Sequence, residues 1–196
     1  MDIHIGFEEI SSIAIGIGLS ASCGFRVFLP LLAAALGVKF GFLPISDHWL
    51  WLGSWPSLII LLTASIIEIV AYYVPFVDNV LDAIAAPMAI AAGALLATSL
   101  MPFEQQPALQ WGLGILAGGS AAGTLHLGSG FIRLLSSKFT AGTGNFVVTS
   151  TENAAAVGGI ISTLIIPILT AILVVISIFL ILWLAYIRFS KEEIKS

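Results

Sequence analysis

Charged side chains are scarce in this sequence. Asp, Glu, Lys and Arg make up 9% of the 196 residues, whereas 59% of the residues are hydrophobic. A soluble domain carries roughly a quarter charged residues to cover its surface. The formal net charge is −4, and no basic cluster of the kind that binds nucleic acid is present. The composition therefore excludes an ordinary soluble domain and predicts no nucleic-acid partner.

Cysteine and catalytic motifs are also nearly absent. The single cysteine, Cys23, excludes an intramolecular disulfide and any cysteine-based metal site. The sequence contains no zinc-protease motif, nucleophile elbow or paired-aspartate signature. We therefore predict that the protein is not an enzyme and needs no cofactor, and leave the question of a metal ligand open. Residues 1–10 lack the positive charge of a signal peptide, so the first apolar segment should remain in the mature protein.

Long runs without charge dominate what remains. A helix needs about 20 apolar residues to cross a bilayer, and the alternation typical of a membrane barrel is absent. Stretches free of Asp, Glu, Lys and Arg include residues 27–38, 83–103, 105–125 and 154–187. The sequence therefore predicts an all-α, polytopic integral membrane helix bundle, formed as a single domain over residues 1–196 and surrounded by the lipid bilayer.

The spacing of these runs predicts about six spans. Four lie near residues 10–36, 57–73, 79–100 and 109–135. The last run, 154–187, would be about 51 Å long as one straight helix, so we expect it to form two spans divided near Pro167. A single long, kinked helix, giving five spans, is the alternative.

The charges at the C-terminus predict the orientation. Arg188, Lys191 and Lys195 follow the last span, and positive residues flank spans on the cytoplasmic side. We therefore expect a cytoplasmic C-terminus, in a bacterial inner membrane or a plastid-type membrane.

A weak internal repeat appears at an offset of 100 residues. It aligns Arg26 with His126 and contains four identities, Ile15, Gly18, Ser20 and Ala21 with Ile115, Gly118, Ser120 and Ala121. Halves 1–103 and 104–196 would then hold three spans each and face opposite ways in the membrane. Inverted repeats with interrupted or re-entrant helices are typical of secondary transporters.

Two charges lie deep in the apolar segments of the first half. Glu68 falls inside the second span, and Arg26 follows a glycine-rich stretch of the first. An unpaired charge in hydrocarbon costs several kcal/mol, so we predict that the two form an ion pair inside the bundle. The alternatives are that Glu68 reaches the headgroups and that Arg26 extends to an interface.

Two aspartates begin the third span. Asp78 and Asp82 are spaced i, i+4 and therefore share a helix face. Asp78 is well placed as an N-cap. Asp82 gains from the helix dipole, and its repulsion with Asp78 suggests a shared cation or proton.

The second half offers His126 and Glu152. His126 is either a hydrogen-bonded core residue or a proton-transfer group that works with Glu152. Arg133 is expected to anchor the helix at the membrane interface. Residues 140–153 are polar and rich in Gly and Thr, so Glu152 lies either in the first turn of a helix or in a re-entrant loop.

Short motifs along the chain resemble an uncharacterised membrane family of bacteria and plastids, domain of unknown function 4126. The matching elements are GFRVF with Arg26, then Glu68, Pro75, Asp78 and Asp82, and later Gly144, Asn145, Ser150 and Glu152. The chain departs from the pattern at four positions: Tyr72 and Tyr73 replace an Asp-Lys pair, and Phe146 and Asn153 replace Pro and Asp. The resemblance implies no particular activity.

The sequence thus predicts a small inverted-repeat transporter or channel for a cation or protons, with coupling to a small solute left open. The candidate binding residues are Glu68, Asp82, Glu152, Arg26, His126, Asp78 and Asn145. The main alternative is a structural or assembly protein that packs against partner spans or lipid, as a homo-oligomer or otherwise. An intramembrane enzyme is a weaker alternative.

Overall fold

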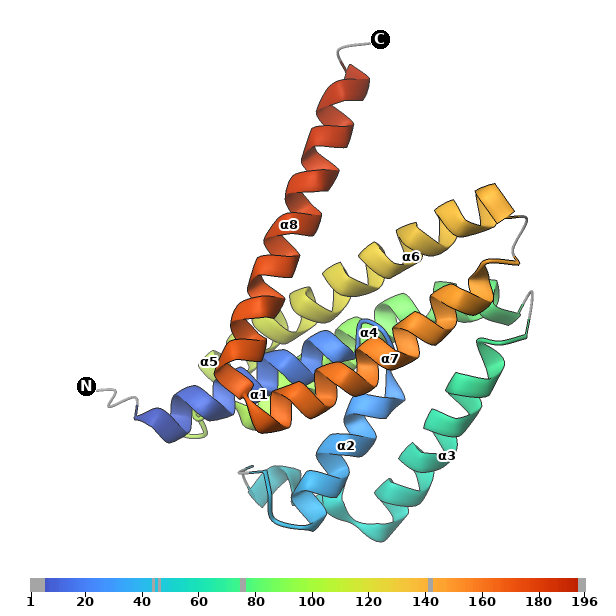
Figure 1. The fold of residues 1–196 in the computed structure, drawn as a ribbon. Helices are drawn as coiled ribbons and strands as arrows, with labels where there is room; N and C mark the ends of the chain where they lie inside the picture. Colours follow the sequence, from blue (N-terminus) through green and yellow to red (C-terminus); the bar gives the residue numbers. More distant parts are fainter. Residues whose placement is uncertain (1–5, 44, 46, 75–76, 141–142, 194–196) are drawn as a thin grey trace.

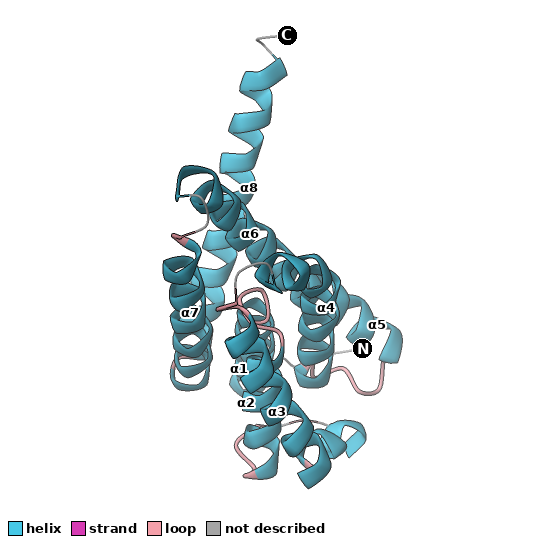
Figure 2. Cartoon of the chain, turned by 90° about the vertical axis from the view of Figure 1, so that its right-hand side faces the viewer, coloured by secondary structure: helices cyan, strands magenta, loops and turns pink. Residues whose placement is uncertain are grey.

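The computed structural model describes residues 6–43, 45, 47–74, 77–140 and 143–193; Pro75 and Lys195 fall outside these ranges. Eight α-helices form the described part, which confirms the all-α class, and Figure 2 shows short loops between them. The helices are α1 (Phe7–Ser22), α2 (Phe28–Lys39), α3 (Trp55–Ala71), α4 (Val77–Leu100), α5 (Pro107–Leu113), α6 (Ser120–Thr140), α7 (Asn145–Ile165) and α8 (Pro167–Glu193). A 3₁₀ segment, η1 (Asp47–Gly53), precedes α3, and a π-helical segment, η2 (Gly114–Gly119), joins α5 to α6.

Among the described residues, two helices are long and apolar enough to cross a membrane, Val80–Leu100 in α4 and Pro167–Ile187 in α8. A third span is added if η1 and α3, which meet at a bend of 57°, count as one. These two or three apolar helices suggest membrane association. The predicted total of six spans goes beyond the two or three that the described helices support.

Helix α4 lies at the centre of the bundle and packs against α1, η2 and α6. Small residues let the backbones approach one another. A Cβ on Gly93 would lie 2.6 Å from both the Gly118 carbonyl oxygen and the Ala122 Cβ. The Ser20 hydroxyl donates a hydrogen bond to the Gly93 carbonyl over 2.7 Å, so α1 is held against the same point.

Breaks in the helices divide the longest apolar segments. The first predicted span is interrupted at residues 23–27, between α1 and α2, and the segment containing Arg26 lies there (Figure 1). The last apolar run divides at Ile166, immediately before Pro167. Proline lacks an N–H and disfavours helical backbone in the preceding residue, so the predicted break near Pro167 is confirmed.

Helix α8 is joined to the bundle along only part of its length. Val174, Ile178 and Ile181 pack against a small cluster around Ala121 and Leu125. Most of its other large apolar side chains are exposed. Figure 1 shows the C-terminal half of α8 leading away from the other helices.

Candidate functional site: a buried ion-pair network

Arg26 lies in the break between α1 and α2 and is 1% exposed. Its Nη1 contacts the Glu152 carboxylate at 3.0 Å, and its Nε donates to the Asn153 side-chain oxygen over 2.6 Å. It also donates to the carbonyls of Phe25 and Thr149. The predicted ion pair between Arg26 and Glu68 is therefore wrong, because the partner of Arg26 comes from α7.

Glu152 is the centre of the network. Its carboxylate accepts from Arg26, from the Nη2 of Arg133 and from the Ser129 hydroxyl. Helix α7 begins at Asn145, about two turns before Glu152, so neither a first-turn position nor a re-entrant loop describes it. Residues 145–151 are helical, and they place Glu152 on the face that points to the bundle interior.

Arg133, from α6, links the network to α4. Its Nη1 contacts the Asp82 carboxylate at 3.0 Å, while its Nη2 contacts Glu152. The residue is 3% exposed, so the prediction of an interface anchor is wrong. Its Nε is buried without a hydrogen-bond partner. Arg133 follows His126 by seven residues, which places the two on one helix face, and this spacing is the sequence feature that fits an internal position.

Tyr72, at the C-terminal end of α3, lies between the two arginines. The guanidinium carbons of Arg26 and Arg133 are 4.1 and 4.7 Å from the centre of its ring. An aromatic face attracts cations, which reduces the repulsion between two guanidinium groups on the same ring. Sequence reasoning did not identify Tyr72 as a site residue.

The network has balanced charges and one accessible end. It runs Asp82–Arg133–Glu152–Arg26 with alternating sign, and its formal charge is zero. The Asp82 side chain is 27% exposed, whereas those of the other three are 7% exposed or less. Paired charges of this kind are what a low-dielectric interior tolerates. Asp82 is therefore the member of the network that is most accessible to its surroundings.

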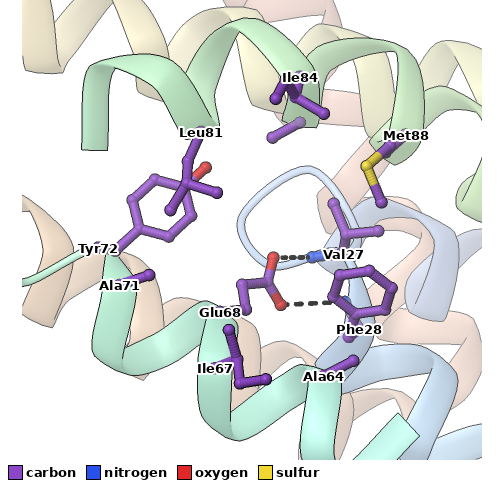
Figure 3. Close-up of a pocket in the computed structure, with 11 residues that line it drawn as sticks. Val27, Phe28, Ala64, Ile67, Glu68, Ala71, Tyr72, Leu81, Ile84 and Met88 are labelled. Carbon is purple, nitrogen blue, oxygen red and sulfur yellow. Dashed lines mark hydrogen bonds between the residues drawn. The ribbon is translucent and has the colours of Figure 1, made fainter. Parts of the chain in front are cut away.

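Glu68 is buried, but it lies outside the ion-pair network. Its two carboxylate oxygens accept backbone N–H groups, Val27 at 2.7 Å and Phe28 at 3.0 Å (Figure 3). These donors open α2, which has no side-chain cap of its own. Glu68 therefore caps α2 from the neighbouring helix α3, and its negative charge suits the helix N-terminus. Its 7% exposure fits the predicted interior position.

A cavity of about 230 Å³ lies beside the Glu68 carboxylate. Figure 3 shows its walls, which are formed by apolar side chains such as Leu81, Ile84 and Met88 of α4 and Ile67 of α3. Tyr72 also lines it, so the cavity adjoins the aromatic side of the ion-pair network.

The remaining predicted residues occupy the edges of this region. Asp78 accepts a hydrogen bond from the Asn145 amide over 3.2 Å, and it lies in the first turn of α4 rather than at an N-cap. The Asn145 amide oxygen in turn accepts from Ser137. His126 Nδ1 is 3.1 Å from the Gly24 carbonyl oxygen, which fits a hydrogen-bonded core residue.

The family model described as domain of unknown function (DUF4126) matches residues 13–186. The chain belongs to this family. No curated protein and no solved structure is significantly similar to the chain.

The family match contains the whole network, and the motifs that carried the resemblance meet in it. Arg26 and Glu152 come from the early and late motifs, and Asp82 comes from the middle one. Two departures from the expected pattern also contact Arg26: the aromatic face of Tyr72 and the amide oxygen of Asn153. Both replacements are uncharged. Each therefore contacts the guanidinium group without adding a negative charge to the network.

Proposed function

We propose that the chain is a small membrane transporter or channel that moves protons, or a cation together with protons. The observation that carries the proposal is the buried network of alternating charges with its accessible end at Asp82. Ionisable groups inside a membrane domain are energetically unfavourable and commonly mark ion or proton pathways. Protonation of Asp82 would leave Arg133 with Glu152 alone, and would thereby change how α4 is held to α6 and α7.

Protons fit this site better than a metal ion. A hard divalent cation takes six or more oxygen ligands, whereas a proton needs one carboxylate. Asp82 and Glu152 are already paired with arginines, which a metal ion would have to displace. Among the described residues, no group of three His, Cys, Asp or Glu side chains is arranged to hold a metal.

We also propose six spans in two inverted halves, residues 1–103 and 104–196. The spans would be α1 with α2, then α3, α4, α5 to α6, α7 and α8. In support, the first and fourth of these segments are irregular in the middle, as interrupted transporter helices are. The offset of 100 residues pairs Arg26 with His126, and His126 contacts Gly24, two residues before Arg26.

The transport proposal predicts proton flux through the purified protein. In proteoliposomes under a pH gradient, the wild-type chain should dissipate the gradient. Asp82→Asn should reduce this flux at least tenfold, because the accessible proton-binding group is lost. Glu8→Gln is the matched control, since Glu8 is an exposed acid in the first turn of α1, and its flux should equal that of the wild type. Wild-type vesicles as tight as protein-free vesicles would contradict the proposal.

The orientation gives a separate prediction. A reporter that works only in the cytoplasm should be active when it is fused after Ser196, and a reporter that works only outside should be inactive there. The reason is that positive residues follow the last span. Activity restricted to the external form of the reporter would reverse the topology, without bearing on the proton site.

A structural or assembly protein is the second candidate. The observation in its favour is α8, whose large apolar side chains are mostly exposed along the half that leaves the bundle. Such a surface suits lipid or a partner span. Vesicles that remain proton-tight, with a protein that is folded in them, would favour this candidate.

A further inference from the structure

A second cavity, separate from the ion-pair network, lies between η1 and α5. Its volume is about 310 Å³, and the side chains that define its chemistry are His48, Trp49, Trp51, Glu104, Gln110 and Trp111. Asp82 lies in the second turn of α4 and Leu100 is its last residue, about 27 Å away along the helix. Gln110 donates to the carbonyls of Thr98 and Met101, so this cavity lies at the end of α4 opposite the network.

The three tryptophans form the aromatic part of this pocket. The ring of Trp49 is centred 6.5 Å from that of Trp51 and 5.9 Å from that of Trp111, with tilts of 33° and 48°. Trp51 is 57% exposed and Trp111 is 44% exposed, so neither ring is used to fill the core. The separations allow a cation on the face of Trp49 to lie within about 6 Å of a neighbouring ring as well.

The charge of the pocket favours a cation. Glu104 contributes a carboxylate from the loop between α4 and α5. Lys39 is held over a different ring, that of Trp55, at 4.7 Å. Within the part of the chain that the structure describes, no Lys or Arg lies over the rings of Trp49, Trp51 or Trp111. The pocket therefore offers aromatic faces and an acid, with no Lys or Arg among its lining residues; His48 also lines it.

The pocket is held in place by the neighbouring helices. The two hydrogen bonds from the Gln110 amide, at 3.0 and 3.3 Å, fix α5 against the end of α4. Gln110 is 7% exposed, and Trp111 follows it directly. On the other side, Leu52 and Gly53 of η1 are buried, which anchors the segment that carries Trp49 and Trp51.

We propose that this pocket binds an alkylated ammonium group, either of a free organic cation or of a lipid headgroup. A quaternary ammonium cannot donate hydrogen bonds, and aromatic faces with one carboxylate are the arrangement that recognises it. An inorganic cation would instead need several oxygen ligands. The proposal is independent of the proton site, because it uses none of the residues of the network.

The experiment is calorimetric titration of the full-length protein in a non-ionic detergent with choline. Saturable binding is expected, and 3,3-dimethylbutan-1-ol, the uncharged analogue of choline, should bind at least tenfold more weakly. Trp111→Leu and Glu104→Gln should each weaken choline binding at least tenfold. Trp55→Leu is the matched control, since this tryptophan lies outside the pocket, and its affinity should be unchanged.

A second arm distinguishes the two sources of the ammonium group. Nanodiscs of phosphatidylcholine and of phosphatidylglycerol are compared for thermal stabilisation of the wild type and of Glu104→Gln. If phosphatidylcholine stabilises the wild type and Glu104→Gln abolishes this effect, the ligand is a lipid headgroup. If choline binds but phosphatidylcholine does not stabilise the protein, the ligand is a free cation. Absence of both effects overturns the proposal, as does equal binding of choline and its uncharged analogue. In that case the tryptophans serve only as a membrane-interface belt.

Discussion

Glu152→Gln is expected to lower the free energy of unfolding by about 3–5 kcal/mol, the largest effect of any single charge removal in this chain. Glu152 is paired with both Arg26 and Arg133. The amide that replaces it is uncharged, so Asp82 alone would balance two buried guanidinium groups. Unfolding of the purified protein in detergent, followed by circular dichroism on heating or in denaturant, measures the change.

A second substitution separates lost pairing from lost packing. Arg133→Met removes one of the two arginines, so the double variant Glu152→Gln, Arg133→Met should be more stable than the sum of the single effects indicates. Glu8→Gln, which removes an exposed acid, should change stability by at most about 1 kcal/mol. Strictly additive losses in the double variant would show that Glu152 and Arg133 are not energetically coupled.

Gly93→Ala is expected to destabilise the protein by about 1–3 kcal/mol or more. In most helix interiors the same change stabilises by roughly 0.5–1 kcal/mol, because glycine loses more conformational freedom on folding. Here the added Cβ would lie 2.6 Å from the Gly118 carbonyl oxygen and 2.6 Å from the Ala122 Cβ, on the facing segments η2 and α6. A backbone carbonyl cannot move aside as a flexible side chain can, so the helices would have to separate.

The control for this prediction is another helical glycine. Gly158, in α7, has open space where a Cβ would be placed, so Gly158→Ala should leave stability unchanged or raise it slightly. Both variants can be compared with the wild type in one thermal unfolding series. A Gly93→Ala protein as stable as Gly158→Ala would show that α4 and η2 do not pack as described.

The membership of the network was partly predictable because buried charge is costly. Arg26, Asp82 and Glu152 lie in or beside apolar segments, and each needs a partner or an opening to solvent. Their pairing was not predictable from the sequence. Glu68 and Glu152 were both available to Arg26, and only the packing of α7 against the break after α1 selects Glu152.

Arg133 and Glu68 show two further limits of sequence reasoning. Arg133 lies near the C-terminal end of an apolar run, where an interface position and an internal position have the same local pattern. Glu68 caps a helix that is 40 residues away in sequence, so no local capping motif records it. The one local sign was negative: the residue before α2 is Val27, which cannot cap a helix with its side chain.

The π-helical segment Gly114–Gly119 changes the direction in which the side chains of α6 point around the helix axis. A π turn amounts to one residue inserted into an α-helix, and one residue corresponds to a rotation of about 100°. With it, Gln110 is directed at the end of α4 while Arg133, on the far side of the segment, is directed at Asp82 and Glu152. At about 100° per residue, a uniform α-helix would place Gln110 and Arg133 about 140° apart around the axis, whereas one inserted residue reduces this angle to about 40°. The inserted residue thus brings Gln110 and Arg133 to the same side of the helix, where Gln110 meets the C-terminal end of α4 and Arg133 meets Asp82 near its start.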